Sequence, residues 1–588
     1  MKDFWKNVLA TIVGMMIVSV LFFFILISSL ASLSLSNPTA KAEDNSVLTL
    51  MLSGQVVECS EENPFTMLTG QISESIGLND IISAIKKAKA DKNIKGIYLE
   101  AGLFAADSPA SSHAIREALL DFKASGKWIV AYADTYTQNT YYICSVADKV
   151  MLNPHGSIDW HGLAAQPYFV KDLLAKFGVK FQLSKVGKYK SAPETMTADK
   201  MSDPNREQVS AYINGIWQVM LADVAKSRKI SVDSLNSFAD HFTAFDEPSA
   251  LKQKKLVDEL MYTNEVKDVI KKLLKTDKPI HQLTVSDMVN MPSADDDGGD
   301  KIAVYYAYGD IVDSETGDIM QQTHNIVATT VCKDLEELTN DDDVKAVVLR
   351  VNSPGGSAYA SEQIWHAVTQ LKAKKPVVVS MGGYAASGGY YISCASNYII
   401  AEPTTITGSI GIFGMFPDFS GLLTDKLGVK FDEVKTNRHA AFGTPARPFN
   451  AEEMAMIDSY IDRGYKLFRQ RVADGRKLPV DKVEEIAQGR VWLGNDALKI
   501  KLVDAIGSLD DAVKKAAELA KSKEYHTAAY PEPADWMEQL MNTANRGSYL
   551  DEEMHAALGE YYEPLRFVKT ISQRSAIQAR LPYFVTIK

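Results

Sequence analysis

The most reactive pattern in the sequence is a serine set among small residues. Ser387 lies in Ala385-Ala386-Ser387-Gly388-Gly389, which follows a predicted strand, Val377–Ser380, and a predicted Gly382–Gly383 turn. Small neighbours let a substrate approach a serine, and the free N–H groups of a helix that begins there can stabilise negative charge. Ser387 is therefore a candidate nucleophile, and the N–H of Gly388 is a candidate oxyanion donor.

A second glycine loop offers the other oxyanion donor. The segment Asn352-Ser353-Pro354-Gly355-Gly356-Ser357 follows the predicted strand Ala346–Val351, and Gly356 is its candidate donor. A Gly-Gly pair is most often only a tight turn. The prediction rests on two such loops that follow neighbouring strands of one βαβ unit and flank the same serine.

A serine hydroxyl needs a base, because it is a weak nucleophile at neutral pH. His439 and His366 have no evident aspartate partner in the sequence. Lys190 is the alternative, and it acts as a base only if burial away from carboxylates lowers its pKa well below the usual value. Lys188 and Lys185 are its nearest rivals.

Lys190 is favoured because the chain contains an internal repeat. Lys176–Phe181 recurs 250 residues later as Lys426–Phe431, and Tyr141–Ile143 recurs 249 residues later as Tyr390–Ile392. Such self-similarity predicts two related structural units.

The two copies have complementary losses. In these registers Ser387 falls opposite Gln138, and Lys190 falls opposite Ala440. The first copy's equivalent of the second glycine loop, residues 102–106, has also lost its paired glycines. The pattern predicts one composite site, with the serine from one copy and the lysine from the other.

Length and charge limit the other possibilities. A chain of 588 residues predicts two to four domains, and a net charge of −11 without a basic stripe argues against a nucleic-acid partner. The four cysteines are scattered without metal-ligand spacing. We expect no metal and no cofactor.

The N-terminus predicts a membrane anchor. Val8–Leu30 contains no charged residue, and as a helix it would span about 34 Å, enough to cross a bilayer. Lys2 and Lys6 precede it, which predicts a cytoplasmic N-terminus and an exported remainder. A cleaved signal peptide is the alternative, because Ala40-Lys41-Ala42 resembles a cleavage site.

Both copies alternate strand and helix patterns, which predicts an α/β fold with mostly parallel sheets. Expected strands are 47–52, 96–100, 128–133 and 150–153 in the first copy, and 302–306, 346–351, 377–380 and 398–401 in the second. Long helices are expected over 206–226 and 451–474, the second with Asn450 as N-cap and Glu453 at its third position. The predicted units are tail, anchor and spacer 1–45, first repeat 46–292, acidic linker 293–300, second repeat 301–522 and C-terminal tail 523–588.

Four motifs resemble those of the signal peptide peptidase A (protease IV) family in its long, duplicated form. They are Lys188–Ala192, Asn352–Ser357, Ala385–Tyr390 and Thr407–Gly411. The resemblance covers residues 46–520 and the N-terminal anchor. It implies tandem Clp/crotonase-like domains and a serine endopeptidase with a Ser/Lys dyad.

The resemblance also implies the role of each site residue. Ser387 is the nucleophile, Lys190 the general base and Ser409 the residue that orients the lysine, while Gly388 and Gly356 match the oxyanion donors. The family implies a homotetramer that degrades signal peptides left in the membrane by signal peptidase. The expected location is the inner membrane, with the catalytic part on the periplasmic side.

Two other classes of protein stay open. A crotonase-type acyl-CoA enzyme uses paired N–H groups of the same fold to hold an enolate. Against it stand the export anchor and the partition of serine and lysine between the copies. A catalytically inactive scaffold is the third hypothesis, and the presence of both Ser387 and Lys190 argues against it.

Overall fold

The computed structural model describes residues 6, 11, 14–19, 41–60, 75–291, 298–314, 324–531 and 577–581. Most of the predicted anchor, most of the predicted linker and most of the C-terminal tail lie outside these residues. Within the described part, no helix is both long and apolar enough to cross a bilayer. The membrane anchor and the domain boundaries therefore stay predictions.

The first repeat is built on a parallel sheet in the order β2-β1-β3-β4-β5-β7, with β8 beside β1. All four strands expected in this copy are confirmed within its central strands, which are apolar because helices cover the sheet. The strands are β1 (Ser46–Val57), β2 (Ser75–Gly77), β3 (Ile94–Ala106), β4 (Trp128–Tyr136), β5 (Lys149–Ile158), β7 (Glu259–Leu260) and β8 (Gln282–Leu283).

The second repeat has an equivalent sheet in the order β18-β16-β14-β12-β9-β20, with β15 beside β14 and β19 beside β15. Its four expected strands are also confirmed, and β20 adds a parallel strand beyond residue 522. The strands are β9 (Asp300–Tyr308), β12 (Val344–Ser353), β14 (Val377–Ala386), β15 (Tyr398–Ala401), β16 (Ile406–Gly408), β18 (Val491–Leu493), β19 (Ala505–Ile506) and β20 (Tyr525–Tyr530).

The predicted turn at Gly382–Gly383 is wrong, because β14 continues through both glycines to Ala386. Close packing explains why glycine stands at these positions. A Cβ on Gly382 would lie 3.0 Å from the Asn352 side chain, and one on Gly383 would lie 2.3 Å from the Ser108 side chain of the first repeat. The glycines let the first repeat approach the strand that leads to Ser387.

A third sheet joins both repeats and the C-terminal segment. Its order is β11-β10-β13-β21-β17-β6. β11 (Asn325–Val327), β10 (Asp310–Val312), β13 (Gly355–Ser357) and β17 (Phe413–Asp418) belong to the second repeat. β6 (Lys180–Lys185) comes from the first repeat and pairs antiparallel with β17, while β21 (Ile577–Arg580) comes from the far C-terminal part.

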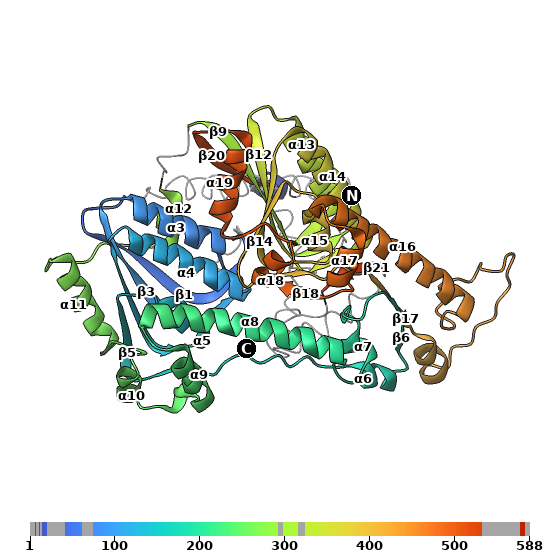
Figure 1. The fold of residues 1–588 in the computed structure, drawn as a ribbon, viewed down its shortest axis with the longest axis horizontal. Helices are drawn as coiled ribbons and strands as arrows, with labels where there is room; N and C mark the ends of the chain where they lie inside the picture. Colours follow the sequence, from blue (N-terminus) through green and yellow to red (C-terminus); the bar gives the residue numbers. More distant parts are fainter. Residues whose placement is uncertain are drawn as a thin grey trace.

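Two long helices, α8 (Asp203–Arg228) and α16 (Ala451–Arg476), pack against the sheets (Figure 1). α8 runs beneath both repeats, and its Gly215 lies so close to β18 that a Cβ there would meet the Leu493 side chain at 2.3 Å. α16 begins with the predicted capping box of Asn450 and Glu453. Both long helices predicted from the sequence are therefore confirmed.

Shorter helices cover the sheets and connect the strands. In the first repeat they are α3 (Leu78–Ala90), α4 (Pro109–Ala124), α5 (Gln138–Cys144), α6 (Lys171–Lys176), α7 (Glu194–Thr197), α9 (Val232–His241), η1 (Thr243–Phe245), α10 (Pro248–Gln253), α11 (Thr263–Leu274) and α12 (Val285–Asn290). In the second repeat they are α13 (Ala328–Asn340), α14 (Ala358–Lys374), α15 (Gly388–Ser393), η2 (Leu422–Lys426), α17 (Val480–Ile486), α18 (Gly494–Lys499) and α19 (Leu509–Ala520).

Buried polar bonds hold the repeats together. Arg350 on β12 donates from Nε to Glu58 Oε1 at 2.6 Å, and both side chains are only 3% exposed. Asn352 donates to Glu58 at 2.9 Å and to Asp107 at 2.8 Å. Burial and the nearby Glu58 raise the pKa of Asp107. Charged groups from both repeats thus meet at one buried contact.

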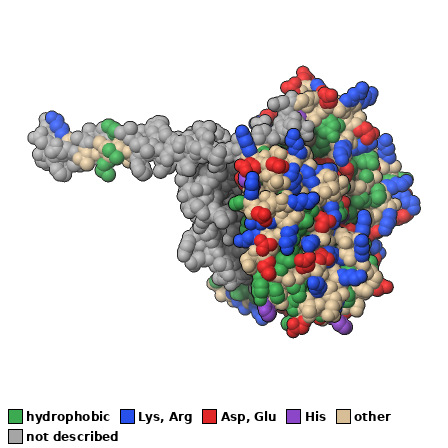
Figure 2. All heavy atoms as spheres, turned by 90° about the vertical axis from the view of Figure 1, so that its left-hand side faces the viewer, with side chains coloured by type: hydrophobic (Ala, Val, Ile, Leu, Met, Phe, Trp, Pro, Cys, Tyr) green, Lys and Arg blue, Asp and Glu red, His purple; other side chains and the backbone are tan. Residues whose placement is uncertain are grey.

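The outer surface carries both signs of charge. On the face shown in Figure 2, Lys and Arg side chains are interspersed with Asp and Glu side chains, and no continuous basic area is visible. A nucleic-acid interface requires such an area. This face therefore offers no support for a nucleic-acid partner.

Candidate active site

Ser387 lies at the junction of β14 and α15, completely buried. Its backbone has φ 55° and ψ −111°, a conformation that an L-residue adopts only under strain. Two main-chain bonds hold it: its N–H donates to Gly408 O at 2.8 Å, and its carbonyl accepts from Tyr391 N at 2.8 Å. The junction thus fixes the direction of the hydroxyl.

Lys190 reaches this serine from the other repeat. Its Nζ lies 2.7 Å from Ser387 Oγ, and the side chain is completely buried. Burial lowers the pKa of Lys190 well below its usual value. A neutral amine at hydrogen-bond distance from a hydroxyl can accept its proton, so this pair can act as nucleophile and base.

Ser409 is the third member of the cluster. Its Oγ lies 3.0 Å from Lys190 Nζ, and its carbonyl oxygen lies 3.2 Å from the same atom. The backbone of Ser409 also has a positive φ, 50°, and its N–H donates to Arg490 O at 2.7 Å. The two contacts from one residue fix the position of the lysine amine beside Ser387.

The two glycine loops meet beside the serine. Gly355 has φ 103°, and a Cβ on it would lie 2.8 Å from the backbone nitrogen of Gly388. The N–H of Gly388 and the segment Gly355–Gly356 therefore lie side by side. Gly356 itself pairs with Ile311 on β10 and with Ala579 on β21.

The loop at Gln488 and Gly489 packs closely against Lys190, a contact that the sequence analysis did not predict. Gly489 has φ +79°, and a Cβ on it would lie 2.6 Å from Lys190 Cβ. The backbone of the same loop is tied to the lysine segment, because Tyr189 N–H donates to Gln488 O at 2.9 Å. Gly489 has no signal of its own in the repeat, and only the spatial approach of Lys190 identifies it.

The rival bases do not reach the serine. Lys185 and Lys188 are exposed, and the Lys188 amine lies over the Tyr189 ring, 5.0 Å from its centroid. His366 is exposed on α14. His439 Nε2 lies 3.7 Å from a Glu452 carboxylate oxygen, and its side chain is 40% exposed. None of these four side chains has a hydrogen bond with Ser387 among the described residues.

Gln138 and Ala440, the positions equivalent to Ser387 and Lys190 in the opposite copies, make no comparable contact with each other within the described chain. Gln138, opposite Ser387, donates to Gly162 O at 2.9 Å and accepts from the N–H groups of His161 and Gly162. Its amide thus stabilises a loop instead of a reacting group. Ala440, opposite Lys190, is exposed. The structure therefore brings together one serine and one lysine from different copies.

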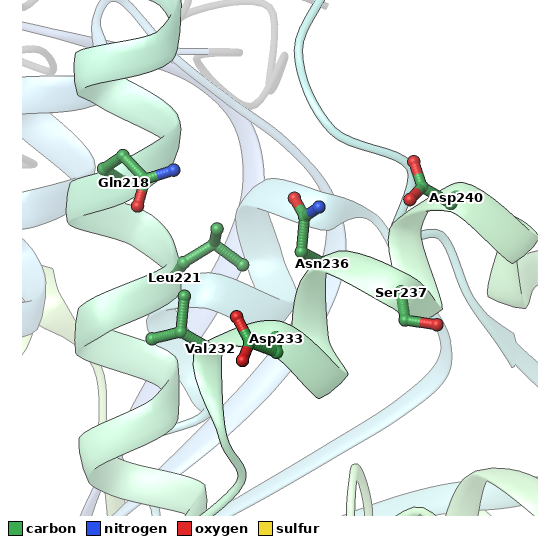
Figure 3. A pocket seen from close by; sticks show the side chains of 7 residues that line it. All are labelled: Gln218, Leu221, Val232, Asp233, Asn236, Ser237 and Asp240. Carbon is green, nitrogen blue, oxygen red and sulfur yellow. The ribbon is translucent and has the colours of Figure 1, made fainter.

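A shallow pocket elsewhere lacks this chemistry. It lies between α8 and α9 and is lined by Gln218, Leu221, Val232, Asp233, Asn236, Ser237 and Asp240 (Figure 3). Asn236 accepts a hydrogen bond from Trp217 Nε1 at 2.9 Å. No lysine, histidine or cysteine lines the pocket, so its one serine has no base there.

Comparison with known proteins identifies the family of this chain. The profile described as "Peptidase family S49" matches residues 121–277 and 369–523, one stretch in each repeat. The chain belongs to peptidase family S49. A second profile, "Clp protease", matches residues 299–405, which include Ser387 and both glycine loops. The α/β fold is thus Clp protease-like, with duplicated S49 domains.

Curated relatives match most of the chain. "Protease 4" of Salmonella typhi is 39% identical over 493 residues, covering 82% of this chain and 78% of that protein. "Protease 4" of Haemophilus influenzae is 36% identical over 529 residues, covering 85% and 82%. "Serine protease SPPA, chloroplastic" of Arabidopsis thaliana is 30% identical over 489 residues, covering 82% and 70%. This S49 chain is therefore a serine protease.

Proposed function

We propose that this S49 protease cleaves peptide bonds with a dyad of Ser387 and Lys190, and that its substrates are signal peptides left in the membrane after signal peptidase has acted. The observation that supports the dyad best is the distance of 2.7 Å between Lys190 Nζ and Ser387 Oγ. The complete burial of the amine favours its neutral form.

In this mechanism neutral Lys190 takes the hydroxyl proton as Ser387 Oγ attacks the scissile carbonyl carbon. The N–H groups of Gly388 and Gly356 stabilise the oxyanion. Protonated Lys190 then gives its proton to the leaving amine, and an acyl-enzyme forms. Lys190 next takes a proton from water, which attacks the ester, and the proton finally returns to Ser387 Oγ.

The proposed location follows from the sequence. The apolar run Val8–Leu30 and the preceding Lys2 and Lys6 support an anchor in the inner membrane with the catalytic part in the periplasm. An anchored protease meets its substrate in or near the bilayer, where cleaved signal peptides remain. The apolar character of such peptides fits a site enclosed by the buried core of two repeats.

The test compares wild type with Ser387→Ala and Lys190→Ala on an apolar fluorogenic peptide amide. Each substitution is expected to lower kcat by about 10⁴-fold or more. The reason is that removing one member of a catalytic unit costs nearly as much rate as removing the whole unit. Lys188→Ala is the matched control, because this exposed lysine lies two residues away. Wild-type turnover in the Lys190→Ala protein would refute the dyad.

The same assay gives a pH profile. Only neutral Lys190 can act as the base, so activity should rise as the pH passes upward through its lowered pKa and fall below it. EDTA should leave turnover unchanged. A rate that is flat from pH 6 to 9, or a rate that EDTA abolishes and metal restores, would contradict this mechanism.

A further inference from the structure

A strand of the chain's own C-terminal part lies between the two second-repeat strands that border the site. β21 pairs antiparallel with β13 on one side and with β17 on the other. β13 contains Gly356, and β17 in turn pairs with β6, which leads to Lys190. An extended peptide thus lies directly against the glycine loop beside Ser387.

The register of β21 places one carbonyl beside the Gly356 donor of the proposed oxyanion hole. Arg580 pairs with Gly355 and Ala579 with Gly356, while Leu581 N–H donates to Pro354 O at 2.8 Å. Hydrogen-bonded pairs alternate along an antiparallel ladder, so Ala579 and Gly356 form the next hydrogen-bonded pair. The Gly356 N–H therefore faces the Ala579 carbonyl oxygen.

The neighbouring glycines confirm where this oxygen lies. It lies 2.1 Å from the position that a Cβ on Gly355 would take, and 3.1 Å from the position of a Cβ on Gly388. A side chain on Gly355 would exclude the carbonyl from this place, and a side chain on Gly388 would crowd it. Ala579 thus has the place of the residue whose carbonyl would be attacked, and Arg580 has the place of the residue after the scissile bond.

The side chains of Ala579 and Arg580 lie in different surroundings, one apolar and one acidic. Ala579 is completely buried in the apolar cluster that includes Ile311 and Ala360. Arg580 Nη2 lies 3.0 Å from Asp310 Oδ1, with the side chains 10% and 21% exposed. A largely buried carboxylate that pairs with a guanidinium favours a positive charge at this place.

We propose that the groove between β13 and β17 binds extended peptides that have a small apolar residue followed by Arg or Lys, and that Asp310 selects the basic residue. Asp310 on β10 is then the specificity-determining residue for the position after the scissile bond. The inference rests on the proposed peptidase function and names the substrate sequence that this site prefers.

The test uses three quenched fluorescent peptides that differ at one position: Ala-Arg, Ala-Gln and Ala-Glu across the expected cleavage point. The readout is the ratio of kcat/KM values within one protein. Because β21 would compete equally with all three peptides, its presence changes each KM by the same factor and leaves the ratio unchanged. Mass spectrometry of the products locates the cleaved bond.

Wild type should prefer the Ala-Arg peptide to the Ala-Gln peptide by about tenfold, the factor expected for one charge-assisted hydrogen bond. Asp310→Asn should bring the ratio close to one, Asp310→Glu should retain the preference, and Asp310→Lys should favour Ala-Glu. Asp343→Asn, at an exposed carboxylate, is the control and should keep the wild-type ratio.

An unchanged ratio in Asp310→Asn, or cleavage after the arginine, would overturn the subsite while leaving the peptidase function intact. Binding measurements separate the two proposals further. In full-length Ser387→Ala protein, fluorescence anisotropy should show about tenfold tighter binding of the Ala-Arg peptide than of Ala-Gln, lost in Ser387→Ala/Asp310→Asn. Equal binding refutes the subsite even where wild type cleaves none of the peptides.

Discussion

Lys190 has an unfavourable position for the stability of the fold. A lysine is strongly hydrated in the unfolded chain, whereas here the amine is completely buried and burial lowers its pKa. Between the lowered pKa and the usual one, the unfolded state binds more protons than the folded state. The free energy of unfolding therefore rises with pH across that window and is lowest below it.

Replacing Lys190 by Met should relieve this cost. Methionine has a similar shape without the charge, so Lys190→Met is expected to raise the free energy of unfolding at pH 7 by about 1 kcal/mol or more. Urea unfolding at several pH values between 7 and 10 would measure it. The variant should show a smaller pH dependence than wild type, and an equal slope in both proteins would contradict the argument.

At the scale of elements, the site depends on strands that cross between repeats. β6 leaves the first repeat and pairs with β17 of the second, which places the following Lys190 beside Ser387. The buried pair of Glu58 and Arg350 holds the ends of β1 and β12 in the same region. A buried ion pair adds little net stability, but the removal of one partner leaves an uncompensated charge.

Arg350→Leu is therefore expected to lower the free energy of unfolding by about 3–5 kcal/mol, since Glu58 would stay buried without its cation. The double variant Glu58→Gln/Arg350→Leu should recover part of that loss. Arg463→Leu, at an exposed position on α16, is the control. Urea unfolding measures all three, and an equal loss in Arg350→Leu and the double variant would contradict this account.

The sequence predicted the elements better than the contacts between them. All eight predicted strands and both long helices are present, because local composition and periodicity specify them. The predicted Gly382–Gly383 turn is wrong because these glycines are required by close packing, of Gly382 against Asn352 and of Gly383 against the distant Ser108. The pairing of β21 with β13 was also not predictable, since strand pairing over such sequence separation has no local signal.

The approach of Lys190 to Ser387 was predictable for a different reason. Ser387 and Lys190 were identified by comparing the two copies, which reveals a loss in each that the other copy supplies. Gly489 could not be found in that way, because its role appears only where its backbone touches Lys190. Candidate reacting residues can be recognised from residue type in the sequence, whereas a residue that makes room for them is recognised only from distances in the structure.

At the scale of the whole molecule, equivalent segments of the two copies have different structures. In the first copy, residues 180–185 form β6 and pair with β17. Their counterparts, residues 430–435, lie in the segment between η2 and α16, residues 427–450. This segment, called the arm below, projects beyond α16 (Figure 1). The arm exposes apolar side chains, with Leu427 64% and Val434 98% exposed. Large apolar side chains exposed along one segment indicate an interaction surface.

The internal symmetry indicates what this arm would bind. The first-copy counterpart of β17 is the stretch 163–169, which forms no strand within the described chain. An arm from one protomer could pair with this stretch of the next in the way that β6 pairs with β17. Head-to-tail contacts form a ring where the rotation between protomers closes, which is what the expected homotetramer requires.

If the arm holds the expected homotetramer together, Phe431→Asp/Val434→Asp should give monomers of 64.8 kDa where wild type gives tetramers, measured by light scattering after size exclusion. Lys435→Asp, which changes charge but removes no apolar surface, is the control. Because Ser387 and Lys190 belong to one chain, the monomer should still hydrolyse a short peptide ester with a kcat close to that of wild type. A monomeric wild type would refute the arm as an assembly contact, whereas an inactive monomer would show that a neighbouring protomer completes the site.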